Sequence, residues 1–511
     1  MSGSTVGRER VPEGGAPAYR VVVGLEVHVQ LKTQTKLFCR CSTRFGEPAN
    51  TQVCPVCMGL PGALPVLNRQ AVELAARAGV GLHSTLSDFT KWDRKNYFYP
   101  DLPKGYQTSQ YDLPICVGGH LDIPLLALRD GTGSENVFKR VRLVRAHLEE
   151  DAGKSLHDER AGRADTKIDL NRAGTPLLEI VSEPDLSSAE EAKTFLSEMR
   201  LLMVTLDVSD GNMQEGSLRA DANVNLHIER EGQWVATPIV EVKNLNSFRS
   251  VERAIEFEVG RQYTEYLRTG LTKGQAPKQT RGWDDVAGVT LLQREKEEEA
   301  DYRYFPCPDL VPVQLTQEQR DRAVEGARST PNAYREALVG GLGIKGTDAE
   351  ILVQQGRGVV EYLMAVVAAG ATAKRATAWM LQDVLRYLND RGVSMEAYPV
   401  SAVRLAELLQ GVETGRVDTA QGRMALGKLL DDPQMSVDAA IESLGIVRVD
   451  VGAVEVLCRE LLAENADVIE KVKGGNSKAV ASLVGQAKKK NRNADPRLVQ
   501  ETCLRLIAEM G

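Results

Sequence analysis

The chain has 511 residues, a formal net charge of −7, and 42% hydrophobic and 26% charged residues. This length predicts two to four domains, and the composition is typical of a soluble globular protein. No apolar run reaches 18 residues, which argues against a transmembrane helix, and the start has no apolar signal segment. We therefore expect a cytoplasmic protein without membrane contact, with a flexible leader over residues 1–18. The net negative charge of the chain argues against general nucleic-acid binding, so any such binding would require a local basic patch.

The first predicted element is a strand over residues 21–31, VVVGLEVHVQL. Alternation along a strand gives it one entirely apolar face and places Glu26 and His28 together on the other. A second face that is simply solvated is the ordinary explanation for such a pair. The pair becomes a candidate site only if other strands bring further acids to the same place.

Four of the eight cysteines lie between residues 39 and 57, spaced as C-x-C, twelve residues, and C-x-x-C. Two close pairs of thiolates joined by a loop match what a tetrahedral zinc site requires. Four buried cysteines without metal are the alternative, but free cysteines rarely cluster in this way. We predict a structural zinc knuckle over residues 39–57, because four thiolates leave no open position for catalysis.

Residues 91–115 form an aromatic and basic segment, KWDRKNYFYPDLPKGYQTSQYDLPI. Its proline and glycine residues predict a loop without regular structure. Aromatic rings beside cations such as Lys95 and Lys104 can stack on a base or an adenosine and pair with phosphates. The same composition would also fit a long loop held to the core by its rings, and both interpretations stay open.

Acids recur in three later segments. HLEEDAGKS contains Glu149 and Glu150, PLLEIVSEPD contains Glu179, and SLRADAN contains Arg219 and Asp221. Burying several carboxylates together is costly unless a cation neutralises them. Carboxylates with an imidazole suit Mg²⁺ or Mn²⁺, which commonly handle phosphate oxygens. The acids therefore predict a cation site that includes the polar face of the first strand.

The pattern changes along the chain. Strand patterns, such as the alternation over residues 217–228, and a helix near Ser247 dominate up to about residue 313. Helical periodicity follows, and the proline-containing stretch 393–402 predicts a second boundary. Near the C-terminus, a predicted helix is followed by the basic run KKKNR. This basic run suggests contact with an RNA backbone, although lysines at a helix C-terminus also complement the helix dipole.

Six blocks in this order resemble the B subunits of bacterial tRNA-dependent amidotransferases, the GatCAB complexes: VGLEVHVQLKTQTKLFC, DRKNYFYPDLPKGYQTSQYDLPI, HLEEDAGKS, DLNRAGTPLLEIVSEPD, MQEGSLRADANV and VKNLNSFRS. GGNSKAVASLVGQAKKK resembles the tail domain shared with the YqeY proteins. The resemblance implies an α+β protein. Its parts are a glutamine synthetase-like, β-rich catalytic cradle over residues 19–313, an all-α helical domain over 314–398, and an α-helical, YqeY-like, tRNA-binding tail over 399–511.

The resemblance also implies a reaction. In that family the complex converts Glu-tRNA(Gln) to Gln-tRNA(Gln), and often Asp-tRNA(Asn) to Asn-tRNA(Asn). The misacylated tRNA is held by the B subunit, which phosphorylates the side-chain carboxyl with ATP and amidates the acyl phosphate. The A subunit supplies ammonia from glutamine, and a small C subunit supports the pair. No glutaminase nucleophile is evident in this chain, which agrees with ammonia made elsewhere.

Matching the family motifs assigns roles to single residues. The implied Mg²⁺ ligands are His28, Glu150 and Glu179. The implied catalytic residues are Glu26, Glu149 and Asp221, which would hold another metal or orient the substrate, and Arg219, which would contact a phosphate or the adenosine. Lys95 and Lys104 are implied to contact ATP, and Cys39, Cys41, Cys54 and Cys57 to hold zinc. In FPCPDL, Cys307 stands where the family usually has Glu, so we assign it no function.

Two other functions compete with this one. The first is a non-catalytic, zinc-containing scaffold that binds tRNA, in which the acids would be structural. The second is a free-standing amide ligase that acts on a small molecule. The acids on several strands argue against the scaffold, and the basic C-terminal region argues against the small-molecule ligase.

Overall fold

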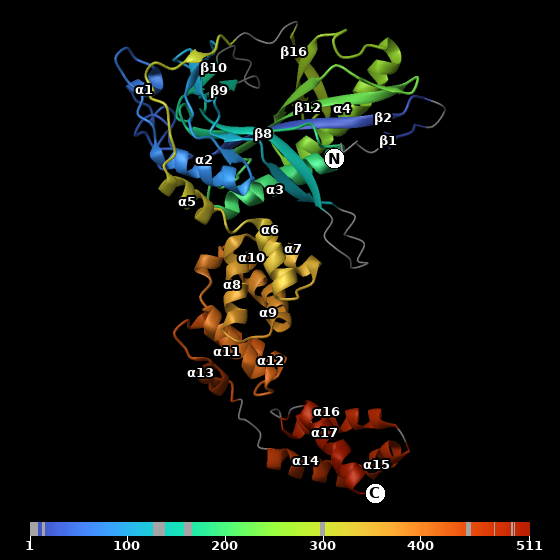
Figure 1. Ribbon diagram of the computed structural model, residues 1–511. Coiled ribbons are helices and arrows are strands. Elements are labelled where there is room, and N and C mark those ends of the chain that lie inside the picture. The colour runs from blue at the N-terminus through green and yellow to red at the C-terminus, as the bar shows by residue number, and fades with distance from the viewer. Residues whose placement is uncertain are drawn as a thin grey trace. The chain divides into compact units, whose positions relative to one another are not determined.

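The computed structural model describes residues 9–12, 16–125, 138–157, 166–296, 302–445, 451–474, 476–491, 494 and 496–510 (Figure 1). The chain divides into two compact units, residues 1–334 and 335–511. The first unit combines a large sheet with helices, and the described part of the second contains helices only. The protein is therefore α+β, as predicted.

The strands are β1 (Glu9–Arg10), β2 (Tyr19–Gln30), β3 (Thr85–Leu86), β4 (Asp93–Asn96), β5 (Tyr106–Ser109), β6 (Cys116–Val117), β7 (His120–Pro124), β8 (Phe138–Glu150), β9 (Lys154–His157), β10 (Thr166–Asp169), β11 (Pro176–Ser182), β12 (Leu218–Arg230), β13 (Gln233–Ala236), β14 (Val240–Leu245), β15 (Lys278–Asp284), β16 (Val289–Lys296) and β17 (Phe305–Pro306).

The helices of the first unit are α1 (Pro55–Met58), α2 (Arg69–Gly81), α3 (Ala189–Thr205), α4 (Phe248–Thr269) and α5 (Gln317–Gly326), and α6 (Pro331–Glu336) reaches into the second. The second unit continues with α7 (Gly346–Gln354), α8 (Arg357–Ala368), α9 (Ala373–Trp379), α10 (Leu385–Arg391), α11 (Ala402–Glu413), α12 (Thr419–Asp431), α13 (Val437–Ser443), α14 (Val451–Glu464), α15 (Ala466–Lys473), α16 (Ala481–Lys490) and α17 (Pro496–Glu509).

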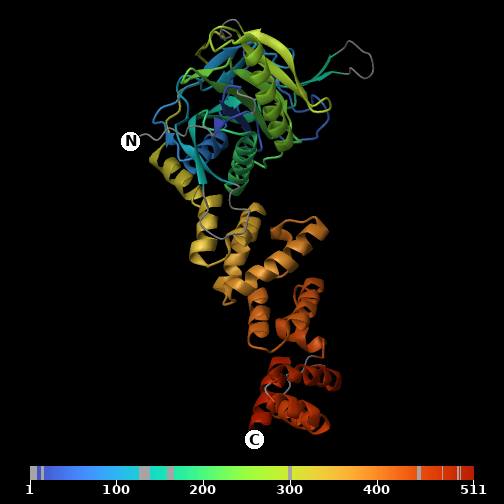
Figure 2. The ribbon, with the colours of Figure 1, turned by 90° about the vertical axis from the view of Figure 1, so that its right-hand side faces the viewer.

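Strand β2 lies in the middle of the sheet, whose order among the described strands is β16-β15-β14-β12-β2-β11-β8-β5-β4-β17. Along this path only β14 and β15 run parallel. The apolar face of β2, with Val21, Val23 and Val27, is buried in one core together with side chains of α2, α3 and α4. Helices α3 and α4 also contact each other (Figure 2). Because these helices cover the apolar face, the polar face of β2 is free to carry a site.

Helix α4 begins where the sequence predicts a helix. The Ser247 Oγ accepts a hydrogen bond from the Ser250 backbone N–H at 3.0 Å, which satisfies a donor in the first turn. We expect Ser247→Ala to lower the free energy of unfolding of the first unit by about 1 kcal/mol. Urea denaturation measures this loss. Ser247→Asp, which restores an acceptor, should recover most of it, and an unchanged midpoint for the alanine variant would contradict the capping role.

Two sequence expectations differ from the structure. Residues 91–115 are not devoid of regular structure, because β4 and β5 pair antiparallel within them and extend the sheet. In the predicted leader, Glu9 and Arg10 pair with β2, whereas residues 1–8 and 13–15 lie outside the described part. Pro100, Pro103 and Gly105 of segment 91–115 fall between the two strands, where a turn requires such residues, and Pro114 follows β5.

The division of the structure falls after residue 334 and not after 313, because α5 packs against α2 of the first unit. The predicted boundary near 398 is not marked by that division. Helices α14 to α17 nevertheless enclose a hydrophobic core of their own, with Leu461, Leu483 and Leu506 buried. In the described part of the chain, none of the helices has the length and apolar character needed to cross a membrane.

Candidate active site

Four adjacent strands bring imidazoles and carboxylates to one place on the polar face of the sheet. In the pairing of β2 with β11, His28 lies opposite Glu179, and in that of β11 with β8, Glu179 lies opposite His147. On the other side of β2, Arg219 of β12 lies opposite His28. Residues opposite each other share a face of the sheet, so the register itself assembles the group.

His28, Glu149 and Glu179 form the centre of this group. The His28 Nε2 lies 3.4 Å from a carboxylate oxygen of Glu179 and 3.7 Å from one of Glu149. The pKa of His28 is lowered by burial, but the two carboxylates outweigh burial and raise it to about 9. Burial, with the charge of Glu179, raises the pKa of Glu149 to about 7. One imidazole and two carboxylates each offer a ligand atom within 4.8 Å of the others, a donor set that fits Mg²⁺ or Mn²⁺.

This group differs by one residue from the ligand set that the sequence predicts, since Glu149 takes the place of Glu150. The Glu150 side chain is buried elsewhere, where it accepts hydrogen bonds from the Lys104 ammonium and from the Thr108 backbone N–H. Consecutive residues of a strand point to opposite faces, so the two glutamates cannot both join His28. Lys104, predicted to contact ATP, is likewise engaged with Glu150.

His147 was missed by the sequence reasoning. It is buried, and its Nε2 lies 3.7 Å from Glu179 and 3.9 Å from Glu149. Burial lowers its pKa to about 4, so the imidazole is neutral near pH 7. Its Nδ1 and one oxygen of Glu149 have no hydrogen-bond partner among the described residues. Its position two residues before Glu149 in a strand was the signal that could have identified it.

A second group of acids lies beside the first on the same face. Glu26, Asp221 and Glu241 place one carboxylate oxygen each within 4.8 Å of the others. The Lys243 ammonium lies 2.6 Å from Asp221 and 3.1 Å from Glu241. Burial raises the pKa of Glu26, and the neighbouring carboxylates raise it further. Lys243 thus supplies part of the positive charge that these acids need.

Arg219 is held by an acid that adjoins the main group. Its guanidinium donates to Asp151 at 2.6 Å, and Arg172 and Gln30 also contact this carboxylate. Burial would raise the pKa of Asp151, but the two arginines outweigh burial and lower it. Asp151 therefore fixes Arg219 beside His28, where a cation can meet a phosphate.

The hairpin of β4 and β5 supplies Lys95 to this side of the sheet. Burial lowers the pKa of Lys95, but the charges of Glu149 and Glu179 prevail and raise it. Some aromatic rings of segment 91–115 hold the loop to the core, and others are exposed and available for stacking. Trp92 is buried against Phe38, whereas Phe98 and Tyr99 are exposed, as surfaces for stacking would be.

The four cysteines converge as predicted from their spacing. The Sγ atom of Cys57 lies 3.7 Å from those of Cys39 and Cys54 and 4.0 Å from that of Cys41. Tetrahedral zinc with bonds of about 2.3 Å separates its sulfurs by about 3.8 Å, so the donor set fits zinc. The hydrogen bond from Cys39, with the charge of Lys36, lowers the pKa of Cys57 to about 4 despite burial.

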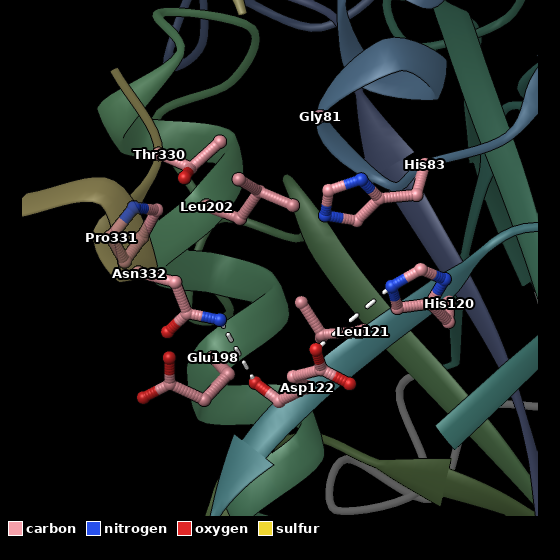
Figure 3. Close-up of a pocket in the computed structure, with 10 residues that line it drawn as sticks. All are labelled: Gly81, His83, His120, Leu121, Asp122, Glu198, Leu202, Thr330, Pro331 and Asn332. Carbon is pink, nitrogen blue, oxygen red and sulfur yellow. Dashed lines mark hydrogen bonds and ion pairs between the residues drawn. The ribbon is translucent and has the colours of Figure 1, made fainter. Parts of the chain in front are cut away.

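A small pocket lies apart from these groups and contains none of their acids (Figure 3). His83 and His120 stack there with ring centroids 4.4 Å apart, and the His120 Nε2 lies 3.9 Å from Asp122. Its volume of about 30 Å³ gives room for little more than ordered water.

The basic residues near the C-terminus are largely paired with acids. Lys471 contacts Asp467, Lys488 contacts Asp418, and Lys490 contacts Glu464. The Lys478 side chain and Arg492 lie outside the described residues. These contacts are exposed and weak, so they can exchange for phosphate contacts at little cost.

Cys307 is buried, and its backbone N–H donates to the carbonyl of Trp92 at 2.7 Å. This contact belongs to the junction between β4 and β17. Nothing in the surroundings assigns Cys307 a function.

The chain matches two known families and several named proteins. It matches the GatB/GatE catalytic domain over residues 21–321 and the GatB domain over residues 361–507. A protein of Rhodopirellula baltica, named as the B subunit of an aspartyl/glutamyl-tRNA(Asn/Gln) amidotransferase, is 55% identical over 489 residues, which cover 96% of this chain and 97% of that protein. Proteins of the same name are 43% identical in Geobacter sulfurreducens, covering 96% of this chain and 99% of that protein, and 44% identical in Burkholderia cenocepacia, covering 95% and 98%. The chain therefore belongs to the family of B subunits of the aspartyl/glutamyl-tRNA(Asn/Gln) amidotransferases.

Proposed function

We propose that this chain activates and amidates the amino acid carried by misacylated tRNA. The substrate is Glu-tRNA(Gln), which becomes Gln-tRNA(Gln), Asp-tRNA(Asn), which becomes Asn-tRNA(Asn), or both. The observation that carries this proposal is the group of His28, Glu149 and Glu179 on a chain of this family. A scaffold that only binds tRNA has no need of such a group, since clustered carboxylates destabilise an empty site.

The chemistry requires activation because a carboxylate has no acceptable leaving group. Transfer of the γ-phosphoryl group of ATP to the side-chain carboxylate gives an acyl phosphate and ADP. Ammonia then attacks the carbonyl carbon, phosphate departs, and the amide forms. The protein's part in both steps is to align the reactants and to stabilise charge on the phosphoryl oxygens.

The residues divide this work by their positions. Glu149, Glu179 and His28 would hold Mg²⁺ or Mn²⁺, which when bound would neutralise phosphate charge. Arg219, fixed by Asp151, and Lys95 would offer cations to the phosphoryl group. The acids Glu26 and Asp221 would hold a further cation or orient the substrate.

Other parts of the chain would support the reaction. The cradle, which we propose to be glutamine synthetase-like, would hold structural zinc in the four-cysteine knuckle. The helical tail would contact the tRNA. An A subunit would deliver ammonia from glutamine, and a C subunit would complete the complex in the cytoplasm. The family membership supports these partners, because the relatives are named as subunits.

Reconstitution tests the proposal. We expect the chain with its A and C partners to form the amide from misacylated tRNA, ATP and glutamine, with one ADP released for each amide. Ammonium chloride should replace glutamine, but nothing should replace ATP. Binding of tRNA without ATP-dependent amidation would support the scaffold instead. Amidation of free glutamate at a similar rate would support a small-molecule ligase.

A further inference from the structure

Lys36 is a fully buried lysine, with 0% of its surface exposed. It lies in the segment that connects β2 to the four-cysteine knuckle. Lysine is seldom buried completely unless a negative group or several acceptors surround its ammonium. Neither the family resemblance nor the reaction proposed above gives this residue a role, so its burial requires an explanation of its own.

The partners of Lys36 lie on two different parts of the chain. Its ammonium donates to the carbonyl oxygen of Gln52 at 2.7 Å and to that of Leu170 at 3.3 Å, and it lies 3.5 Å from the Cys57 Sγ. Gln52 and Cys57 belong to the knuckle. Leu170 belongs to residues 168–175, a segment that leads into β11 and hence to Glu179.

The knuckle and the segment 168–175 are joined by further contacts. The Asn171 side chain accepts from the Gln52 backbone N–H at 2.9 Å, and the Asn50 side chain bonds the backbone of residues 168 and 170. The Leu37 backbone N–H, next to Lys36, donates to the Gly174 carbonyl at 2.8 Å. A zinc ion in the knuckle would therefore stabilise this segment through the same contacts.

Charge explains why a lysine stands here. Four thiolates around Zn²⁺ carry a net charge of −2, which is unfavourable in a partly buried site. One ammonium beside a thiolate halves this charge and donates to sulfur, as partners of metal ligands commonly do.

We propose that Lys36 is a positioning residue of the knuckle, which holds Cys57 toward zinc and couples zinc binding to the order of residues 168–175. This inference rests on the zinc assignment made under the proposed function. It concerns a residue whose ammonium contacts Gln52, Leu170 and Cys57 rather than the acids on the sheet.

The test uses the full chain purified with its A and C partners. Wild type should hold about one zinc per chain, and Lys36→Met should release zinc to a chromogenic chelator about 10–100-fold faster. Methionine keeps the apolar stem and removes the charge. Lys32→Met is the matched control, because the Lys32 side chain is 62% exposed and its ammonium pairs with Asp207 on the surface. It should release zinc at the wild-type rate.

Two further measurements separate this role from a purely structural one. The thiolate-to-cobalt charge-transfer band of the Co²⁺-loaded chain should shift in Lys36→Met. Removal of zinc from wild type should speed hydrogen exchange at residues 168–175, and Lys36→Met should show the fast exchange before zinc is removed. If Lys36→Met does not fold, Lys36→Gln, which can still donate hydrogen bonds, should also release zinc faster.

The results of these measurements test the role of Lys36 and the zinc assignment separately. Wild-type zinc release in both Lys36 variants would overturn the proposal, as would zinc removal that leaves exchange at residues 168–175 unchanged. A wild-type chain without zinc would overturn both this inference and the zinc assignment. The amidation assay on the same preparation distinguishes that result from a failure of the proposed reaction.

Discussion

Glu179→Gln is expected to reduce amidation of misacylated tRNA by about 10³-fold or more while leaving tRNA binding within about twofold. The substitution keeps the shape of the side chain and removes the charge that faces both His28 and His147. A cation held by this group would supply several kcal/mol of charge stabilisation to phosphoryl transfer, and each 1.4 kcal/mol is about tenfold in rate. The amidation assay and a tRNA filter-binding assay measure the two quantities.

Two comparisons test this prediction: a control at a distant glutamate, and a comparison of Glu149 with Glu150. Glu229→Gln, at the far end of β12 from Asp221, should retain activity, because the hydrogen bond that its side chain accepts in the described structure comes from the Gly232 backbone N–H. Glu149→Gln should be as inactive as Glu179→Gln. A defective Glu150→Gln beside an active Glu149→Gln would favour the ligand set predicted from the sequence over the group found in the structure.

Asp151→Asn is expected to lower the free energy of unfolding of the first unit by about 2–3 kcal/mol. Breaking a buried ion pair commonly costs about 3–5 kcal/mol, and the loss is smaller here because water can reach the arginines. The Asp151 side chain is 3% exposed, whereas those of Arg219 and Arg172 are 34% and 30% exposed. Urea denaturation of the purified chain measures the change.

The same substitution should also weaken catalysis, because Arg219 loses the contact that fixes it beside His28. The matched control is Asp207→Asn, which removes an exposed contact to Lys32 and should change stability by less than about 1 kcal/mol. Equal stability losses in the two variants would show that Asp151 contributes no more than a surface acid.

The alternation of the first strand was the most informative pattern in the sequence. It placed Glu26 and His28 on one face, and the structure places them there, between β11 and β12. The strand pattern over residues 217–228 and the helix near Ser247 are also confirmed. These predictions succeeded because a period of two, or a helical stripe that begins after a serine, depends on a single element.

The rest depended on relations between elements. Glu149, and not Glu150, lies beside His28 and Glu179 because of the register in which β8 pairs with β11. The sequence of a single strand does not give this register. The burial of Lys36 depends on carbonyl groups that are 16 and 134 residues away. The hairpin of β4 and β5 was missed because proline and glycine were taken to exclude strands, although a turn between two short strands also requires them.

The central position of β2 has a consequence for synthesis of the protein. Along the main path of the sheet β2 lies between β11 and β12, and Val23 pairs with residue 224, about two hundred residues later in the chain. Contacts of such sequence separation form slowly, and until then an apolar strand has two open edges. The first unit therefore cannot close its core before residue 230 has left the ribosome, and we expect shorter nascent chains to be prone to aggregation.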